Sequence, residues 1–128
     1  MHQFNGQFHY RSFCPKAGGK DRAAQITAPW TPPGVLTVAT DETGKVTGTL
    51  KFGAAAELKV SGSITPASEK DGLPEGFDLV GEGMTAVYRV RGYFVEGVQR
   101  VTGSVLSTQN DLAGQPPGTI GPFILFPV

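Results

Sequence analysis

The sequence predicts an all-β protein, built as a small antiparallel up-and-down β-barrel of seven or eight strands. Its 128 residues and 13.5 kDa suit a single domain over residues 1–128. Polar and apolar residues alternate along most segments, which is typical of half-buried strands. Short connections between consecutive segments favour antiparallel neighbours. A β-sandwich is the alternative, since it accommodates the same number of strands.

A five-residue pattern with a central glycine recurs along the chain and favours the barrel over the sandwich. Each copy consists of an apolar residue, any residue, glycine, any residue and a second apolar residue. Glycine inside a strand marks a bend, a bulge or a close backbone approach. On the inner face of a sheet, such glycines indicate the strong coiling of a small barrel. The copies are centred on Gly6, Gly48, Gly62, Gly92 and Gly103.

The first half of the chain contains four predicted strands. The hairpin of the last two is the clearest, because apolar residues alternate with Lys, Thr, Glu and Ser in both. The acidic start and closing glycine of residues 41–44 suit a tight turn before this hairpin. The four strands are residues 3–13, 34–40, 45–52 and 57–65.

Three segments are predicted to be loops. Prolines forbid regular pairing in residues 14–33, where a short helical turn is expected at 23–25. Residues 66–76 combine two prolines, two glycines and a cluster of charges. Residues 109–118 are rich in Pro, Gly, Asn and Asp.

The remaining segments complete the strand count. Residues 77–95 have an extended pattern throughout, and this length exceeds that of a normal strand. A break near residues 81–83 would divide the segment into two strands. Residues 98–108 form the next strand. Residues 119–127 are almost wholly apolar, which predicts burial on both faces, by the barrel core and by a neighbour or a second subunit.

Composition and charge restrict the partners. Lys and Arg number 11 and Asp and Glu number 11, so the formal net charge is zero. This balance predicts no nucleic-acid partner and no polybasic membrane contact. No apolar run approaches the roughly 18 residues of a membrane-spanning helix. We therefore expect no membrane partner.

The single cysteine and the N-terminal residues predict a cytoplasmic location. Cys14 has no second cysteine with which to form an intramolecular disulfide. The sequence begins without an apolar signal core. No zinc spacing, phosphate-binding loop or dinucleotide fingerprint occurs, so the sequence predicts neither a metal site nor a cofactor.

Residues 41–50 (DETGKVTGTL) resemble the early hairpins of avidin-like and other calycin barrels. This resemblance implies a calycin-like architecture and carries over no binding residue. Trp30 is the only tryptophan, and the tryptophan-rich ligand walls of avidin-like proteins have no counterpart here. Small barrels of this kind also resemble allene oxide cyclase and dirigent proteins in architecture.

Glu82 and Tyr88 are the candidate catalytic residues. If residues 80–94 form one continuous strand, both side chains lie on a mostly apolar inner face. A desolvated carboxylate acts as an acid or base near neutral pH, and Tyr88 would bind a carbonyl or an enolate. In the alternative, Gly81 and Gly83 form a turn or bulge and Glu82 faces water.

Aromatic residues are the candidate ligand-binding groups. Eight Phe, three Tyr and one Trp either fill a small barrel or line an apolar cavity. The residues assigned to the ligand are Tyr10, Trp30 and Phe94. Trp30 lies in a proline-rich segment, where it covers one barrel mouth or anchors the loop to the outside.

Three functions follow as hypotheses. The first is binding of a small, mostly apolar molecule in the barrel. The second is a cofactor-independent isomerase, cyclase or hydratase that uses Glu82 with Tyr88 or Tyr10. The third is a structural or assembly domain, forming a homo-oligomer through the apolar C-terminal strand.

Overall fold

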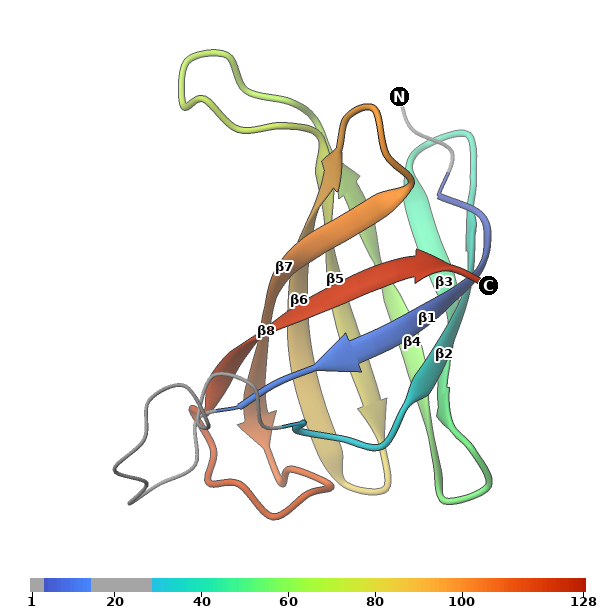
Figure 1. Cartoon of the computed structure of the whole chain (residues 1–128), viewed down its shortest axis with the longest axis vertical. Helices are drawn as coiled ribbons and strands as arrows, with labels where there is room; N and C mark the ends of the chain where they lie inside the picture. The colour runs from blue at the N-terminus through green and yellow to red at the C-terminus, as the bar shows by residue number, and fades with distance from the viewer. Residues whose placement is uncertain (1–3, 15–28) are drawn as a thin grey trace.

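The chain forms a closed barrel of eight antiparallel strands in sequential order, as Figure 1 shows. This computed structural model describes residues 4–14 and 29–128. The predicted up-and-down barrel is confirmed, and closure of the sheet rules out the sandwich. The helical turn predicted at 23–25 lies outside the described residues. The strands are β1 (Gly6–Ser12), β2 (Gly34–Thr40), β3 (Lys45–Phe52), β4 (Ala56–Thr65), β5 (Gly76–Gly83), β6 (Ala86–Val95), β7 (Arg100–Gln109) and β8 (Ile120–Pro127).

Hairpins build most of the barrel, and one long-range pair closes it. The predicted β3–β4 hairpin is confirmed, with Lys45 opposite Ser63 and Phe52 opposite Ala56. The closing pair joins β1 to β8, with Phe8 opposite Pro127. Every strand therefore has two neighbours, so no strand edge is left free for pairing.

The reversal between β5 and β6 lies beyond its predicted position. Gly83 pairs with Ala86, so Met84 and Thr85 form a two-residue turn rather than the break predicted near 81–83. Both turn residues have positive φ, at 49° and 71°. A tight hairpin needs this conformation, which glycine and asparagine adopt more readily than a β-branched threonine.

Glycines permit the close approach of neighbouring strands. A Cβ atom at Gly62 would collide with the carbonyl oxygen of Asp78 on β5. Gly48 and Gly103 are equally close to a carbonyl oxygen of the adjacent strand. The role predicted for the repeated glycines is thus confirmed at these positions, whereas a Cβ at Gly6 would meet nothing.

A cluster of phenylalanines fills the barrel end that carries the β2–β3, β4–β5 and β6–β7 connections (upper end of Figure 1). Phe4 stacks on Phe77 with ring centroids 4.8 Å apart and an interplanar angle of 8°. Phe94 meets the ring of Phe4 edge-on at 5.6 Å. Phe4 and Phe77 are 2% and 0% exposed, so this end of the core is tightly packed.

β8 is buried on its inner face only. Phe123 and Leu125 are completely or almost completely buried, as predicted for the core side. Ile120 and Ile124 point outward and are 55% and 41% exposed in the single chain. Burial on the core side is therefore confirmed, and cover of the outer face by a neighbour or a second subunit stays a prediction. No helix in the described parts of the chain is long and apolar enough to cross a membrane.

Candidate ligand-binding site

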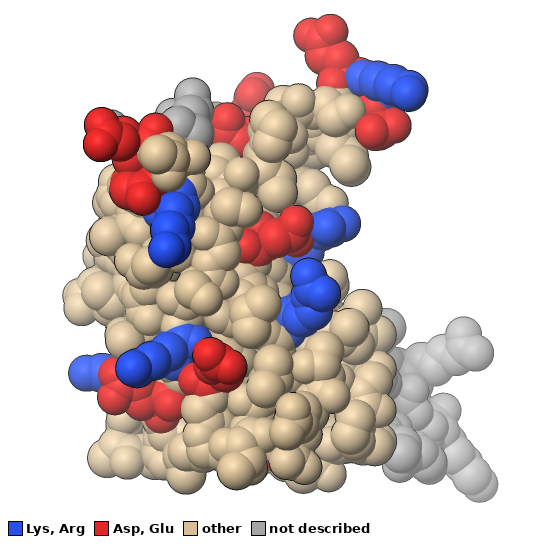
Figure 2. Space-filling model, turned by 180° about the vertical axis from the view of Figure 1, so that it is seen from behind, with Lys and Arg blue, Asp and Glu red and all other residues tan. Residues whose placement is uncertain are grey.

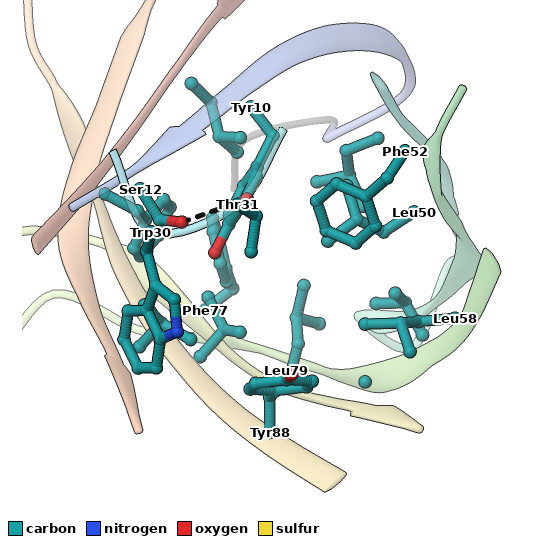
Figure 3. Close-up of a pocket in the computed structure, with 17 residues that line it drawn as sticks. Tyr10, Ser12, Trp30, Thr31, Leu50, Phe52, Leu58, Phe77, Leu79 and Tyr88 are labelled. Carbon is teal, nitrogen blue, oxygen red and sulfur yellow. Dashed lines mark hydrogen bonds between the residues drawn. The ribbon is translucent and has the colours of Figure 1, made fainter. Parts of the chain in front are cut away.

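A cavity of about 30 Å³ lies inside the barrel, toward the end opposite the phenylalanine cluster. Figure 3 shows side chains from several strands converging on it. Inward positions of the strands supply the wall, because alternate residues of each strand face the interior. The lining residues used below are Tyr10, Ser12, Trp30, Thr31, Phe52, Leu58, Gly81 and Tyr88.

The volume of this cavity limits what it holds without rearrangement. A water molecule needs roughly 10–15 Å³ of such space, and ligand pockets usually provide about 300–1,000 Å³. The described interior is thus largely filled by its own side chains, with room left for one compact group. Gly81 contributes to this space, because it faces the cavity without a side chain.

Hydroxyl groups provide the polar part of a lining that is otherwise apolar. Ser12 Oγ and Thr31 Oγ1 lie 3.3 Å apart and share a hydrogen bond. Tyr10 is 4% exposed, and burial raises the pKa of its phenol to about 12, although a hydrogen bond with Ser12 opposes this rise. The phenol therefore stays neutral and keeps its proton at ordinary pH. No charged side chain occurs among the described lining residues.

A hydrogen-bonded network closes one side of the cavity. Asp111, in the β7–β8 loop, accepts hydrogen bonds from Trp30 Nε1 at 2.8 Å and from the Tyr88 hydroxyl at 2.5 Å. The backbone N–H of Gln115 donates a third at 2.9 Å. The Tyr88 oxygen in turn accepts the N–H of Leu112 at 2.6 Å. Both Trp30 and Tyr88 are only 5% exposed, so the network fixes part of the cavity wall.

The pKa values of Asp111 and Tyr88 are both shifted farther from neutral pH. Burial raises the pKa of Asp111, but hydrogen bonds from Tyr88 and Trp30 outweigh it and hold that pKa below its usual value. Burial, followed by the hydrogen bond to Asp111, raises the pKa of Tyr88. The pair therefore remains a carboxylate and a neutral phenol, whereas an acid–base catalyst needs a pKa near the working pH.

Three of the five predicted site residues meet at the cavity. Tyr10, Trp30 and Tyr88 line it, as Figure 3 shows. Phe94 lies instead in the phenylalanine cluster at the opposite end. Trp30 covers the mouth rather than the outside of the barrel. This agrees with the first of its two predicted positions.

Glu82 lies on the outer face of β5 and is exposed. Its predicted inward orientation is wrong, and the alternative in which it faces water is confirmed. The reason is the two-residue turn: Gly83 and Ala86 are opposite each other and share a face. Residues an even number of positions apart therefore lie on opposite faces of the sheet when this turn separates them. On β5 the inward residues are Phe77, Leu79 and Gly81.

Asp111 is the polar residue of this site that the sequence analysis missed. The sequence signal was its position as the only acidic residue in the loop at 109–118, after Asn110. Asp and Asn commonly accept backbone hydrogen bonds in such loops. Its partners Trp30 and Tyr88 are distant in sequence, so only the closed fold shows that they meet it.

The chain matches no known family, no curated protein and no solved structure. The class that fold and site define is a closed eight-stranded β-barrel with one packed end and a small apolar cavity behind a hydrogen-bonded loop. The resemblance of residues 41–50 to calycin barrels remains a prediction.

Proposed function

We propose that the protein binds a compact, neutral, mostly apolar molecule that carries one hydroxyl or carbonyl group. The observation that carries this proposal is the apolar cavity with the hydroxyls of Tyr10, Ser12 and Thr31 in its wall. Binding sites for small molecules combine such an apolar lining with a few placed polar groups. The apolar part of the ligand would contact Phe52 and Leu58.

Neutrality of the ligand follows from the charges around the cavity. The described wall offers no cation to pair with a buried anion, and the carboxylate of Asp111 lies directly behind Tyr88. Burying an unpaired charge is strongly unfavourable. A hydroxyl or carbonyl, by contrast, can exchange its hydrogen bonds with water for bonds to Tyr10 or Ser12.

The size of the ligand depends on the cavity volume and on whether the hydrogen-bonded network of Asp111 opens. One compact group fills about 30 Å³, and a larger molecule requires the network of Asp111 to open. Binding in a site that must first open is weakened by the cost of opening it. We therefore expect modest affinities for small probes, and higher affinity for variants with a looser loop.

Two probes of similar shape and different charge test this function. Cyclohexanol and cyclohexanecarboxylate are titrated into the ¹⁵N-labelled protein, and amide shifts are followed by NMR. We expect saturable shifts near Gly81 and Tyr88 with cyclohexanol only. Gly81→Ala should weaken binding, since the added methyl group occupies the cavity and contacts Leu58 at an ordinary 3.6 Å. Ser61→Ala on the outer face is the matched control.

The proposal fails if cyclohexanol produces no saturable shift, or if its shifts map to the outer surface. It also fails if the carboxylate binds as well as the alcohol. An enzyme that uses Glu82 is not favoured, because that side chain lies outside the barrel. Asp111 and Tyr88 do not replace it as an acid–base pair, because their pKa values lie away from neutral pH.

A further inference from the structure

An apolar stripe runs along the outer face of β8. It consists of the outward residues Ile120, Pro122, Ile124 and Phe126, of which the two isoleucines are 55% and 41% exposed. Alternate residues of a strand are roughly 6.6–6.8 Å apart, so the stripe is roughly 20 Å long. Single exposed apolar residues are common, but a contiguous row of them indicates a contact surface.

Basic side chains surround one end of this stripe. The guanidinium groups of Arg11 and Arg100 lie 5.6 Å and 5.7 Å from the centre of the Phe126 ring. The ring of His9 lies 5.0 Å from the same phenylalanine. Each arginine uses one terminal nitrogen on a backbone carbonyl, that of Tyr10 or of Gln99. A guanidinium has five N–H donors, so both keep donors for a partner.

The strands around the stripe carry no carboxylate. The segments β7, β8, β1 and β2 contain Arg11, Arg100 and His9, and no Asp or Glu. The opposite side of the barrel is different. Figure 2 shows acidic and basic side chains lying beside one another there. On β5 and β6, Asp78 pairs with Arg91 at 2.7 Å. This pair lines an outer hollow with Ile120, so it borders the Ile120 end of the stripe and not the end at Phe126. The charge of Arg11 and Arg100 is thus not balanced within their own half of the sheet.

We propose that this β8 surface, formed by Ile120, Ile124, Phe126, Arg11 and Arg100, docks an acidic polypeptide segment with carboxylates beside apolar side chains. The carboxylates would bind the free guanidinium donors, and the apolar side chains would cover the isoleucines. Alternate residues of an extended segment have the same spacing as the stripe. The closed sheet offers no free edge, so side chains rather than backbone pairing would hold the segment.

Charge and shape favour such a segment over other occupants. Two copies packed through this surface would bring arginines together without any strand carboxylate to pair with them. Like charges brought together in an interface oppose association. A lipid surface favours apolar groups that protrude, whereas the Phe126 ring is half-buried and flanked by two guanidinium groups and an imidazole.

Fluorescence anisotropy with a defined peptide tests the proposal. The probe is a fluorescein-labelled peptide of about twelve residues in which Glu and Leu alternate, and its counterpart replaces Glu by Lys. We expect only the Glu peptide to bind. Arg100→Glu should weaken its binding about tenfold or more, as should a rise in salt from about 0.05 to 0.5 M. Lys59→Glu, an exposed charge reversal on β4, the strand farthest from β8 in the closed sheet, should leave it unchanged.

Several outcomes would overturn the proposal. Equal binding of both peptides, or equal loss in Lys59→Glu and Arg100→Glu, would show that the surface has no specific role. Sedimentation with vesicles containing about a third phosphatidylglycerol, without peptide binding, would assign the surface to membranes. A dimer that Ile124→Ser dissociates would assign it to a second copy. Circular dichroism checks that each variant is folded, and Arg100→Gln replaces Arg100→Glu if the latter is not.

Discussion

The hydroxyl of Tyr88 donates a 2.5 Å hydrogen bond to Oδ1 of Asp111, and this bond joins the barrel wall to the β7–β8 loop. The other carboxylate oxygen of Asp111 accepts the indole N–H of Trp30. One side chain from an irregular loop thus holds two aromatic residues of the cavity wall.

Replacement of Asp111 by Asn should destabilise the protein by about 1.5–3 kcal/mol. The side-chain amide of Asn lacks the negative charge that strengthens the hydrogen bonds from Trp30 and Tyr88. Its NH₂ group also replaces one of the two acceptor oxygens, so it faces one of these donors with a second donor. Urea unfolding followed by circular dichroism measures the change. Glu82→Gln, which alters an exposed carboxylate on β5, should stay within about 0.5 kcal/mol of the parent. A loss in Asp111→Asn as small as that would contradict a structural role for the network.

Stability should fall as the pH rises above about 10. The pKa of Tyr10 is raised from 10.0 to about 12 in the folded state, so between these values the folded chain holds a proton that the unfolded chain releases. The stabilisation is complete below pH 10 and is lost as the pH approaches 12. It amounts to about 2–3 kcal/mol for Tyr10. Denaturant unfolding at several pH values measures it, and Tyr10→Phe should make the fall shallower, leaving the part that comes from the raised pKa of Tyr88. An unchanged profile in that variant would assign the alkaline loss to other groups.

Two glycines on neighbouring strands should respond oppositely to Ala. Gly62→Ala places a methyl group against the carbonyl oxygen of Asp78, and we expect a loss of about 1–3 kcal/mol. Gly81→Ala meets only Leu58 and Val60 at 3.6–3.9 Å, and it has no positive φ. It should be neutral or stabilising, because it fills part of the cavity. Thermal unfolding of both variants checks this, and equal losses would contradict the contrast in packing.

Thr85→Gly should stabilise the protein by about 0.5–1 kcal/mol. Thr85 has a φ of 71°, a left-handed conformation that costs a side-chain-bearing residue about 1–2 kcal/mol. Glycine removes this cost, although it loses more backbone entropy on folding. Thr49→Gly in the middle of β3 should destabilise instead. The comparison uses the urea midpoints of the two variants, and a loss in Thr85→Gly would show that the turn is not strained.

The sequence was sufficient for the features that depend on neighbouring residues. The hairpin of β3 and β4 and the inward glycines at 48, 62 and 103 follow from alternation and local turns. The orientation of Glu82 did not follow. Glu82 and Tyr88 are an even number of residues apart, but the two-residue turn at Met84 and Thr85 places them on opposite faces. Alternation specifies faces only within one strand.

The candidate site was less accessible from sequence than the fold. Alternation predicts inward positions for Tyr10 and Tyr88, where they lie, but it leaves Trp30 between the barrel mouth and the outside. Their relation to Asp111 depends on contacts between residues far apart in the chain. The size of the cavity depends on how the side chains pack, and a pattern of apolar positions does not determine it.

The pairing of β1 with β8 has a consequence for the route by which the chain folds. Seven of the eight strand pairs join consecutive strands and can form as local units. The eighth joins Phe8 to Pro127 and must bring distant parts of the chain together. Closing so large a loop carries an entropic cost that contacts near in sequence avoid. We expect the β1–β8 seam to form late, so that amide hydrogens of β3 and β4 gain protection from exchange before those along the seam.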